Sequence, residues 1–113
     1  MKEFEQKGIV QFVDLEGQDE FEKTKAQSTA QNIFEKIKRI SKAETSLTVH
    51  VKRHDIQGTR KKYSIHARVN WPGHFFEASH TDWDFLTATQ SALQALVHEV
   101  KKKHEKESGK RRR

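Results

Sequence analysis

The hydrophobic residues change their spacing along the chain, and the order of these spacings limits the fold more than any other feature. Residues 30–40 and 85–100 repeat apolar side chains every three or four positions, which is the period of a helix with one buried face. Residues 47–51 and 63–69, between them, alternate apolar and polar side chains, as half-buried strands do. This order predicts an α+β domain with helices packed on a sheet.

The N-terminal part predicts one strand followed by one long helix. Residues 8–14 form a short apolar run rich in β-branched and aromatic side chains, which is typical of a largely buried strand. Asp19 and Glu22 then form an Asp-x-x-Glu capping pattern. We therefore expect a helix from this cap to about Ile40.

The central part predicts three strands joined by two hairpins. The two alternating segments are separated by residues 54–59, which we interpret as a flexible hairpin loop. In the second hairpin, Pro72 and Gly73 fit the second and third positions of a type II turn. This turn leads into a third strand at residues 75–79.

The last apolar stripe predicts a second helix. Asp82 is its expected N-cap, with Asp84 in the first turn. The stripe ends at Val100 without a helix breaker, so the helix is expected to project a charged turn or two past the core. Residues 108–113 are expected to be a disordered basic tail, which leaves residues 1–107 as a single α/β domain.

The order strand, helix, three strands, helix restricts the topology. A right-handed crossover makes the first two strands parallel neighbours, and short hairpins make the others antiparallel. The predicted fold is therefore a four-stranded mixed sheet of order β-α-β-β-β-α, with two helices on one face, similar to double-stranded RNA-binding folds. On the opposite, open face we expect these residues of the central strands: Thr48, His50, Lys52, Ser64, His66 and Arg68.

Positive charge is concentrated in two segments. Residues 52–68 hold six Lys and Arg against one acid, and residues 101–113 hold eight against two, whereas residues 69–100 hold four acids and no Lys or Arg. A row of phosphates would be neutralised by such segregated charge, although each segment alone is also typical of a solvated surface. We predict two basic clusters that meet at one edge of the sheet and bind RNA. The predicted RNA-binding residues are Lys52, Arg53, Arg60, Lys61, Lys62, Arg68, Lys101, Lys102, Lys103 and Lys106.

Aromatic residues narrow the kind of RNA contact. The expected open face of the two central strands has no aromatic pair for base stacking, which argues against an RNA recognition motif. Trp83 is expected to pack under the start of the last helix. Trp71, at the turn, is expected either to pack in the core or to form an exposed stacking platform.

Other classes of function find little support. The chain has no Cys, which excludes disulfides and thiolate chemistry. Ser79, His80 and Asp82 lie too close together in one segment to form a catalytic triad, and His50 and His54 are about 13 Å apart along a strand, too far to share a metal. We expect neither an enzyme nor a cofactor, metal or small-molecule site. Without a signal peptide or an apolar segment of about 20 residues, we expect a cytoplasmic protein with no membrane partner.

The chain also resembles a known family over residues 47–106, just over half of its length. The likeness rests on Leu47-Thr48-Val49-His50-Val51, the Pro72-Gly73 turn, Phe76-Glu77-Ala78-Ser79, Asp82-Trp83-Asp84-Phe85-Leu86-Thr87-Ala88, Ala92-Leu93, Leu96, and Lys101-Lys102-Lys103-His104-Glu105-Lys106. Taken together, these segments are similar to the ribosome hibernation-promoting factors, also known as ribosome-associated inhibitor A or protein Y.

This resemblance implies a stress or stationary-phase factor that binds ribosomal RNA in the decoding region of the small ribosomal subunit and blocks messenger and transfer RNA. By the same resemblance, Lys52, Arg68 and the three lysines 101–103 face the ribosomal RNA. We expect a short-form member that acts as a monomer, with residues 1–107 as its single ribosome-binding domain. Two alternatives stay open: a general structured-RNA-binding or RNA-chaperone module, and a protein–protein regulator with an acidic partner.

Overall fold

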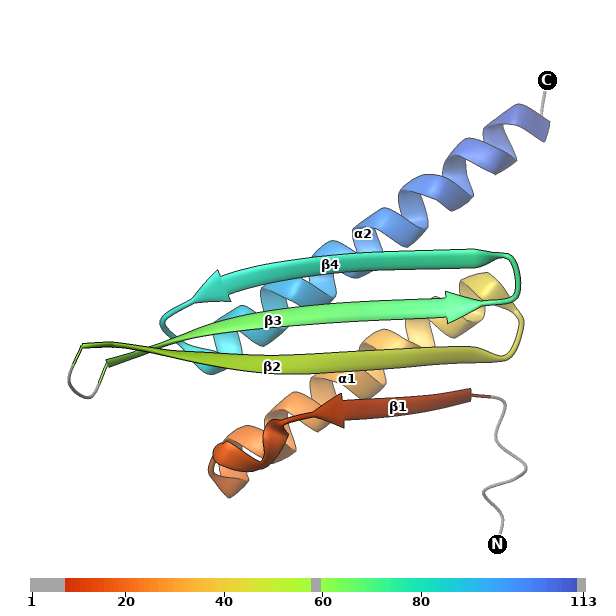
Figure 1. Cartoon of the computed structure of the whole chain (residues 1–113). Helices are drawn as coiled ribbons and strands as arrows, with labels where there is room; N and C mark the ends of the chain where they lie inside the picture. The colour runs from red at the N-terminus through yellow and green to blue at the C-terminus, as the bar shows by residue number, and fades with distance from the viewer. Residues whose placement is uncertain (1–7, 58–59, 112–113) are drawn as a thin grey trace, which may run out of the picture.

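The computed structural model contains a four-stranded sheet with two helices packed on one face (Figure 1). It describes residues 8–57 and 60–111, with side chains for residues 9–54 and 61–105. The observed order confirms the predicted β-α-β-β-β-α fold. The elements are β1 (Gly8–Val13), a 3-10 turn (Leu15–Gly17), α1 (Glu20–Ser41), β2 (Thr45–Gln57), β3 (Arg60–Trp71), β4 (His74–Asp82) and α2 (Phe85–Arg111).

The strands lie in the order β1-β2-β3-β4, so chain order and spatial order coincide. β1 is parallel to β2, and the other neighbours are antiparallel, as predicted from the connections. Val49 lies opposite Ala67, which lies opposite Ala78, so the small and β-branched residues of one face form continuous rows.

The core lies between this face and the helices. It combines alternate residues of the central strands with one stripe from each helix, as the periodicities predict. No helix in the described part of the chain is long and apolar enough to cross a lipid bilayer. The main core residues are Leu47, Val49, Val51, Ile65, Ala67 and Val69 from the sheet, Ala30, Ile33, Phe34 and Ile37 from α1, and Phe85, Ala92, Leu93, Leu96 and Val100 from α2.

The β2–β3 hairpin is longer than predicted. β2 continues to Gln57 and β3 begins at Arg60, so the prediction of a loop from residue 54 is wrong; residues 58–59 lie outside the described residues. A register shift between Asp55 and Gln57 lets the polar segment keep pairing, because a bulge absorbs the irregularity. In Figure 1 this hairpin extends beyond the neighbouring strands.

The second hairpin turns as predicted. Gly73 has φ +82, the left-handed value that the third position of a type II turn requires. β4 is longer than the predicted 75–79, because its pairing with β3 continues until Asp82 lies opposite Tyr63.

The ends of the helices follow the capping rules with one correction. Asp19 accepts a 2.8 Å hydrogen bond from the Glu22 amide, as predicted for α1. At α2 the predicted cap, Asp82, is wrong, because this residue still belongs to β4. Asp84 is the cap instead: its Oδ2 accepts from the amide of Thr87 at 2.9 Å and from its hydroxyl at 2.7 Å. These two bonds lower the pKa of Asp84.

The C-terminal end of α2 also differs from the expectation. Residues 108–113 are expected to be a disordered tail, whereas α2 continues to Arg111; residues 112–113 lie outside the described residues. No proline interrupts this segment, and its Lys and Glu are good helix formers. α2 therefore extends well past Val100, the last buried residue of its apolar stripe.

Candidate nucleic-acid interface

Both helices cover the same face of the sheet (Figure 1), and the opposite face carries mainly polar side chains. Side chains alternate along a strand, so the neighbours of the buried residues on β2 and β3 point away from the helices. The structure places all six residues predicted for the open face there: Thr48, His50, Lys52, Ser64, His66 and Arg68.

The register aligns these side chains with those of β4. Ser64 and Thr81, in one row, are joined by a 2.9 Å hydrogen bond between their hydroxyl oxygens. Hydroxyl groups beside Lys and Arg are suited to phosphate and ribose oxygens. Three successive rows across β2, β3 and β4 are Lys52–Ser64–Thr81, His50–His66–Ser79 and Thr48–Arg68–Glu77.

His66 lies at the centre of these rows. Desolvation lowers its pKa, the positive charges of Lys52 and His50 lower it further, and Glu77 opposes the change. A phosphate near this imidazole would favour the protonated form, because an anion stabilises the positive charge. His50 also lies 3.3 Å from a carboxylate oxygen of Asp14.

Arg53 does not belong to the open face. It is on the helix side of β2, where its Nε donates to Oε1 of Gln18 at 2.8 Å and its Nη2 donates to the carbonyl of Asp14 at 2.7 Å. The structure therefore gives this predicted RNA-binding residue a structural role, in which it ties the β1–α1 connection to β2. The sequence count of charges did not separate the two faces of the strand.

The remaining hairpin cations divide between the two sides of β3. Lys62 is on the open face, with its Nζ 5.1 Å from the centre of the Trp83 ring. Lys61, the next residue back along β3, alternates to the other side and is exposed. Arg60 is within β3, but its side chain lies outside the described residues.

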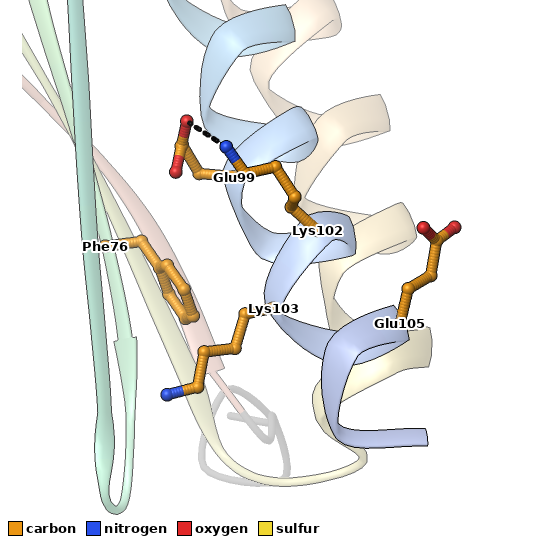
Figure 2. Close-up of a pocket in the computed structure, with 5 residues that line it drawn as sticks. All are labelled: Phe76, Glu99, Lys102, Lys103 and Glu105. Atoms are coloured by element: carbon orange, nitrogen blue, oxygen red, sulfur yellow. Dashed lines mark ion pairs between the residues drawn. The ribbon is translucent and has the colours of Figure 1, made fainter. Parts of the chain in front are cut away.

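The second basic cluster is on α2. Lys101, Lys102 and Lys103 are exposed, and the side chain of Lys106 lies outside the described residues. Figure 2 shows Lys102 directed along the helix toward Glu99, with 4.0 Å between the charged atoms, and Lys103 directed toward β4. A cleft of about 590 Å³ between α2 and β4 is lined by Phe76, Glu99, Lys102, Lys103 and Glu105.

The two clusters do not meet at one edge as predicted: Arg68, three residues before Trp71, lies at the same end of the sheet as Lys103 but on the other face, and Lys62 lies at the far end. Lys103 shares a small cavity with Trp71 and His74, at the β3–β4 turn. Lys62 is nine residues from Trp71 along β3, or about 30 Å away. α2 begins where β4 ends, near the β2–β3 hairpin, and runs back along the sheet, so its basic end reaches the far end of the opposite face (Figure 1).

Two exposed aromatic residues of the open face were missed by the sequence analysis. Phe75, 57% exposed, has the Arg68 guanidinium carbon 5.7 Å from its ring centre. Trp83 is 42% exposed beside Lys62, so the prediction that it packs under α2 is wrong. The alternation of Phe76 and Ala78, which pack against the core, was the available signal that Phe75 points the other way.

Trp71 belongs to the core side of the turn. It is half-buried and packs against Phe76 and His74, with ring centres 5.5 and 5.0 Å apart. Of its two expected roles, the structure supports packing.

Comparisons with known proteins agree with this fold. The family model described as Sigma 54 modulation protein / S30EA ribosomal protein matches residues 13–108. No curated protein gives a significant match. The N-terminal domain of Thermus thermophilus protein Y, a crystal structure, is 19% identical with a TM-score of 0.58, over 83% of this chain and 93% of that one. A ribosomal subunit interface protein from Coxiella burnetii is 15% identical with a TM-score of 0.43, over 90% and 98% of the two chains.

The structural likeness at these identities shows the fold, and the family match covers most of the sequence. The resemblance to ribosome hibernation factors and the expectation of a non-enzymatic protein are thereby confirmed. The chain belongs to the Sigma 54 modulation protein / S30EA ribosomal protein family, whose members are ribosome-associated modulation factors and not enzymes.

Proposed function

We propose that this protein is a ribosome hibernation factor that occupies the decoding region of the small subunit and blocks messenger and transfer RNA by its presence there. It acts as a monomer in the cytoplasm, without a cofactor. The observation that supports RNA contact is the open face of the sheet, where Lys52, Lys62 and Arg68 are grouped with hydroxyl and imidazole side chains and both helices lie on the other side.

The charge of this face supports contact with phosphates. Glu77 beside Arg68 and Asp14 beside His50 offset only part of the positive charge. If the three cations each neutralise one phosphate, the logarithm of affinity falls with the logarithm of salt concentration with a slope of about −2 to −3. Binding through this face is therefore expected to weaken markedly between low and physiological salt.

The separation of the two basic clusters favours a folded ribosomal site over any single duplex. Lys62 is on the open face near the start of β3, whereas Lys103 lies on the helix side beside Trp71, which is about 30 Å from Lys62 along β3. One straight duplex lying on the sheet cannot contact both, whereas the walls of a ribosomal cleft can. In this proposal the lysines 101–103 contact a second segment of ribosomal RNA.

Sedimentation with purified small subunits tests the proposal. The wild type is expected to co-sediment at physiological salt and to be displaced by transfer RNA. The variant Lys52→Glu/Arg68→Glu is expected to lose most of this binding. Lys25→Glu/Lys36→Glu, with the same charge change at exposed positions of α1, is the matched control and is expected to retain it.

Other results would support the alternatives. Equal affinity for any duplex RNA, without competition by transfer RNA, would indicate a general RNA-binding module. Absence of RNA binding by the folded wild type would indicate a protein–protein regulator. Either result refutes the decoding-region assignment.

A further inference from the structure

We infer that Phe75 and Trp83 are two stacking platforms for unpaired nucleotides, so that the open face binds single-stranded RNA segments by their bases as well as their phosphates. This inference rests on the proposed function and deepens it, because it names the kind of ribosomal RNA that the face takes.

The exposure of these two rings needs an explanation. Phe75 is 57% and Trp83 42% exposed, whereas Tyr63, Trp71 and Phe76 pack against the core. Alternation places Phe75 on the face that carries Arg68 and Lys52, and the contact with Lys62 places Trp83 beside the same face. Large apolar rings exposed among cations are the usual elements of a surface that binds single-stranded nucleic acid.

Each ring has its own cation. The guanidinium carbon of Arg68 lies 5.7 Å from the centre of Phe75, and Nζ of Lys62 lies 5.1 Å from the centre of Trp83. Such contacts hold the ring in place and keep a positive charge within reach of the phosphate of a stacked nucleotide. The same ring-and-cation pair therefore occurs twice, once at each end of β4.

The surroundings of Phe75 add a group that can contact a base edge. Asn70 is its partner across the β3–β4 register and is exposed. Its amide can both donate and accept hydrogen bonds, as the edge of an unpaired base requires. Phe75 and Trp83 are eight residues apart, on the order of 25 Å along a strand, so they bind different nucleotides.

The arrangement favours RNA over a protein partner. A protein interface concentrates its aromatic anchors at the centre and its polar groups at the rim. Here the centre of the face is occupied by Lys52, Ser64 and His66, and the aromatic rings lie toward its ends along β4.

Paired oligonucleotides separate stacking from charge. The affinity of the full chain is measured for an unstructured single-stranded RNA and for an abasic oligonucleotide with the same number of phosphates. Phe75→Leu/Trp83→Leu keeps apolar side chains but removes both ring faces. This variant is expected to bind the base-containing RNA at least about tenfold more weakly, with less than a twofold change on the abasic strand.

Phe21→Leu is the matched control, because Phe21 is 66% exposed on α1. It is expected to leave both affinities unchanged. Thermal unfolding of the double variant checks that the fold is retained, and the single variants supply the same test if it is not. Equal affinity of the double variant and the wild type for the base-containing strand would overturn the inference, as would equal losses on both strands.

Small-subunit sedimentation distinguishes this inference from the proposed function. If the wild type does not sediment with subunits, but the double variant still loses affinity for the base-containing RNA, the ribosomal assignment is refuted and the stacking role is retained. A double variant that loses subunit binding but keeps full affinity for single-stranded RNA would assign the rings to a protein contact and overturn the stacking role.

Discussion

Lys52 and Arg53 are adjacent basic residues of β2, and the structure predicts that their removal has opposite consequences. Lys52 points to the open face and is exposed, whereas Arg53 points to the helix side and binds the β1–α1 connection. Replacing either residue with Met removes one positive charge and keeps a long apolar stem. Comparing the two variants therefore separates the effect of losing a positive charge from the effect of where that charge lies in the fold.

The expected cost of Arg53→Met follows from its two hydrogen bonds. A hydrogen bond from a charged donor contributes about 1.5–3 kcal/mol when well buried, but these two are part-buried and exposed, so we take about 0.5–1.5 kcal/mol for each. The acceptor of the second bond, the Asp14 carbonyl, belongs to a residue at φ 65, a left-handed conformation that L residues rarely adopt. We expect a total loss of about 1–3 kcal/mol in the free energy of unfolding.

Urea denaturation measures this loss, and RNA titration across a salt series measures the charge contribution. Arg53→Met is expected to lower the urea midpoint and leave the salt dependence of RNA affinity unchanged. Lys52→Met is expected to leave the midpoint within about 0.5 kcal/mol of wild type and to reduce the slope against salt by about 1.

The reverse result would refute this reasoning. If Arg53→Met reduces the salt slope as much as Lys52→Met while its stability is unchanged, the guanidinium contacts phosphate and the assigned hydrogen bonds do not matter. If neither variant changes the slope, the open face is not the surface that binds RNA.

Three further predictions concern α2 and the open face. Asp84→Ala is expected to lower the free energy of unfolding by about 1 kcal/mol at pH 7. Because folding lowers the pKa of Asp84, the carboxylate stabilises the fold fully above its ordinary pKa near 3.8, and this stabilisation is lost as pH falls through the lowered pKa. Denaturation at a series of pH values measures the difference between wild type and variant. RNA affinity is expected to rise as pH falls from 7.5 to 6, because bound phosphate favours protonation of His66, whose pKa is lowered in the free protein. If a His66→Gln variant shows the same pH dependence of RNA affinity as the wild type, this explanation is contradicted. Lys101→Glu/Lys102→Glu/Lys103→Glu is expected to abolish small-subunit sedimentation without lowering the melting temperature, since these residues lie beyond the last buried residue of α2; unchanged sedimentation would remove this cluster from the mechanism.

The sequence by itself determined the order of elements and the core. The change between helical and strand periods predicts which residues are buried, because a buried face must repeat with the period of its own backbone. Leu47, Val49 and Val51 show this for β2, and Leu93 and Leu96 show it for α2. The capping pattern at Asp19 and the turn at Gly73 are equally local, since each depends on residues within one turn of the chain.

Strand alternation in the sequence placed the open-face residues, but the partners of Arg53 and the distance between the hairpin and the end of α2 were decided only by the tertiary structure. Net charge along the sequence grouped Arg53 with Lys52, and it joined the α2 lysines with Lys62, which the fold keeps at the other end of the sheet. Whether a charge meets solvent or another part of the chain depends on which strand edge, loop or helix end lies beside it, and these contacts join residues far apart in sequence. The length of β4 decided the cap of α2 in the same way, because pairing with β3 carries the strand to Asp82 and leaves Asp84 as the cap.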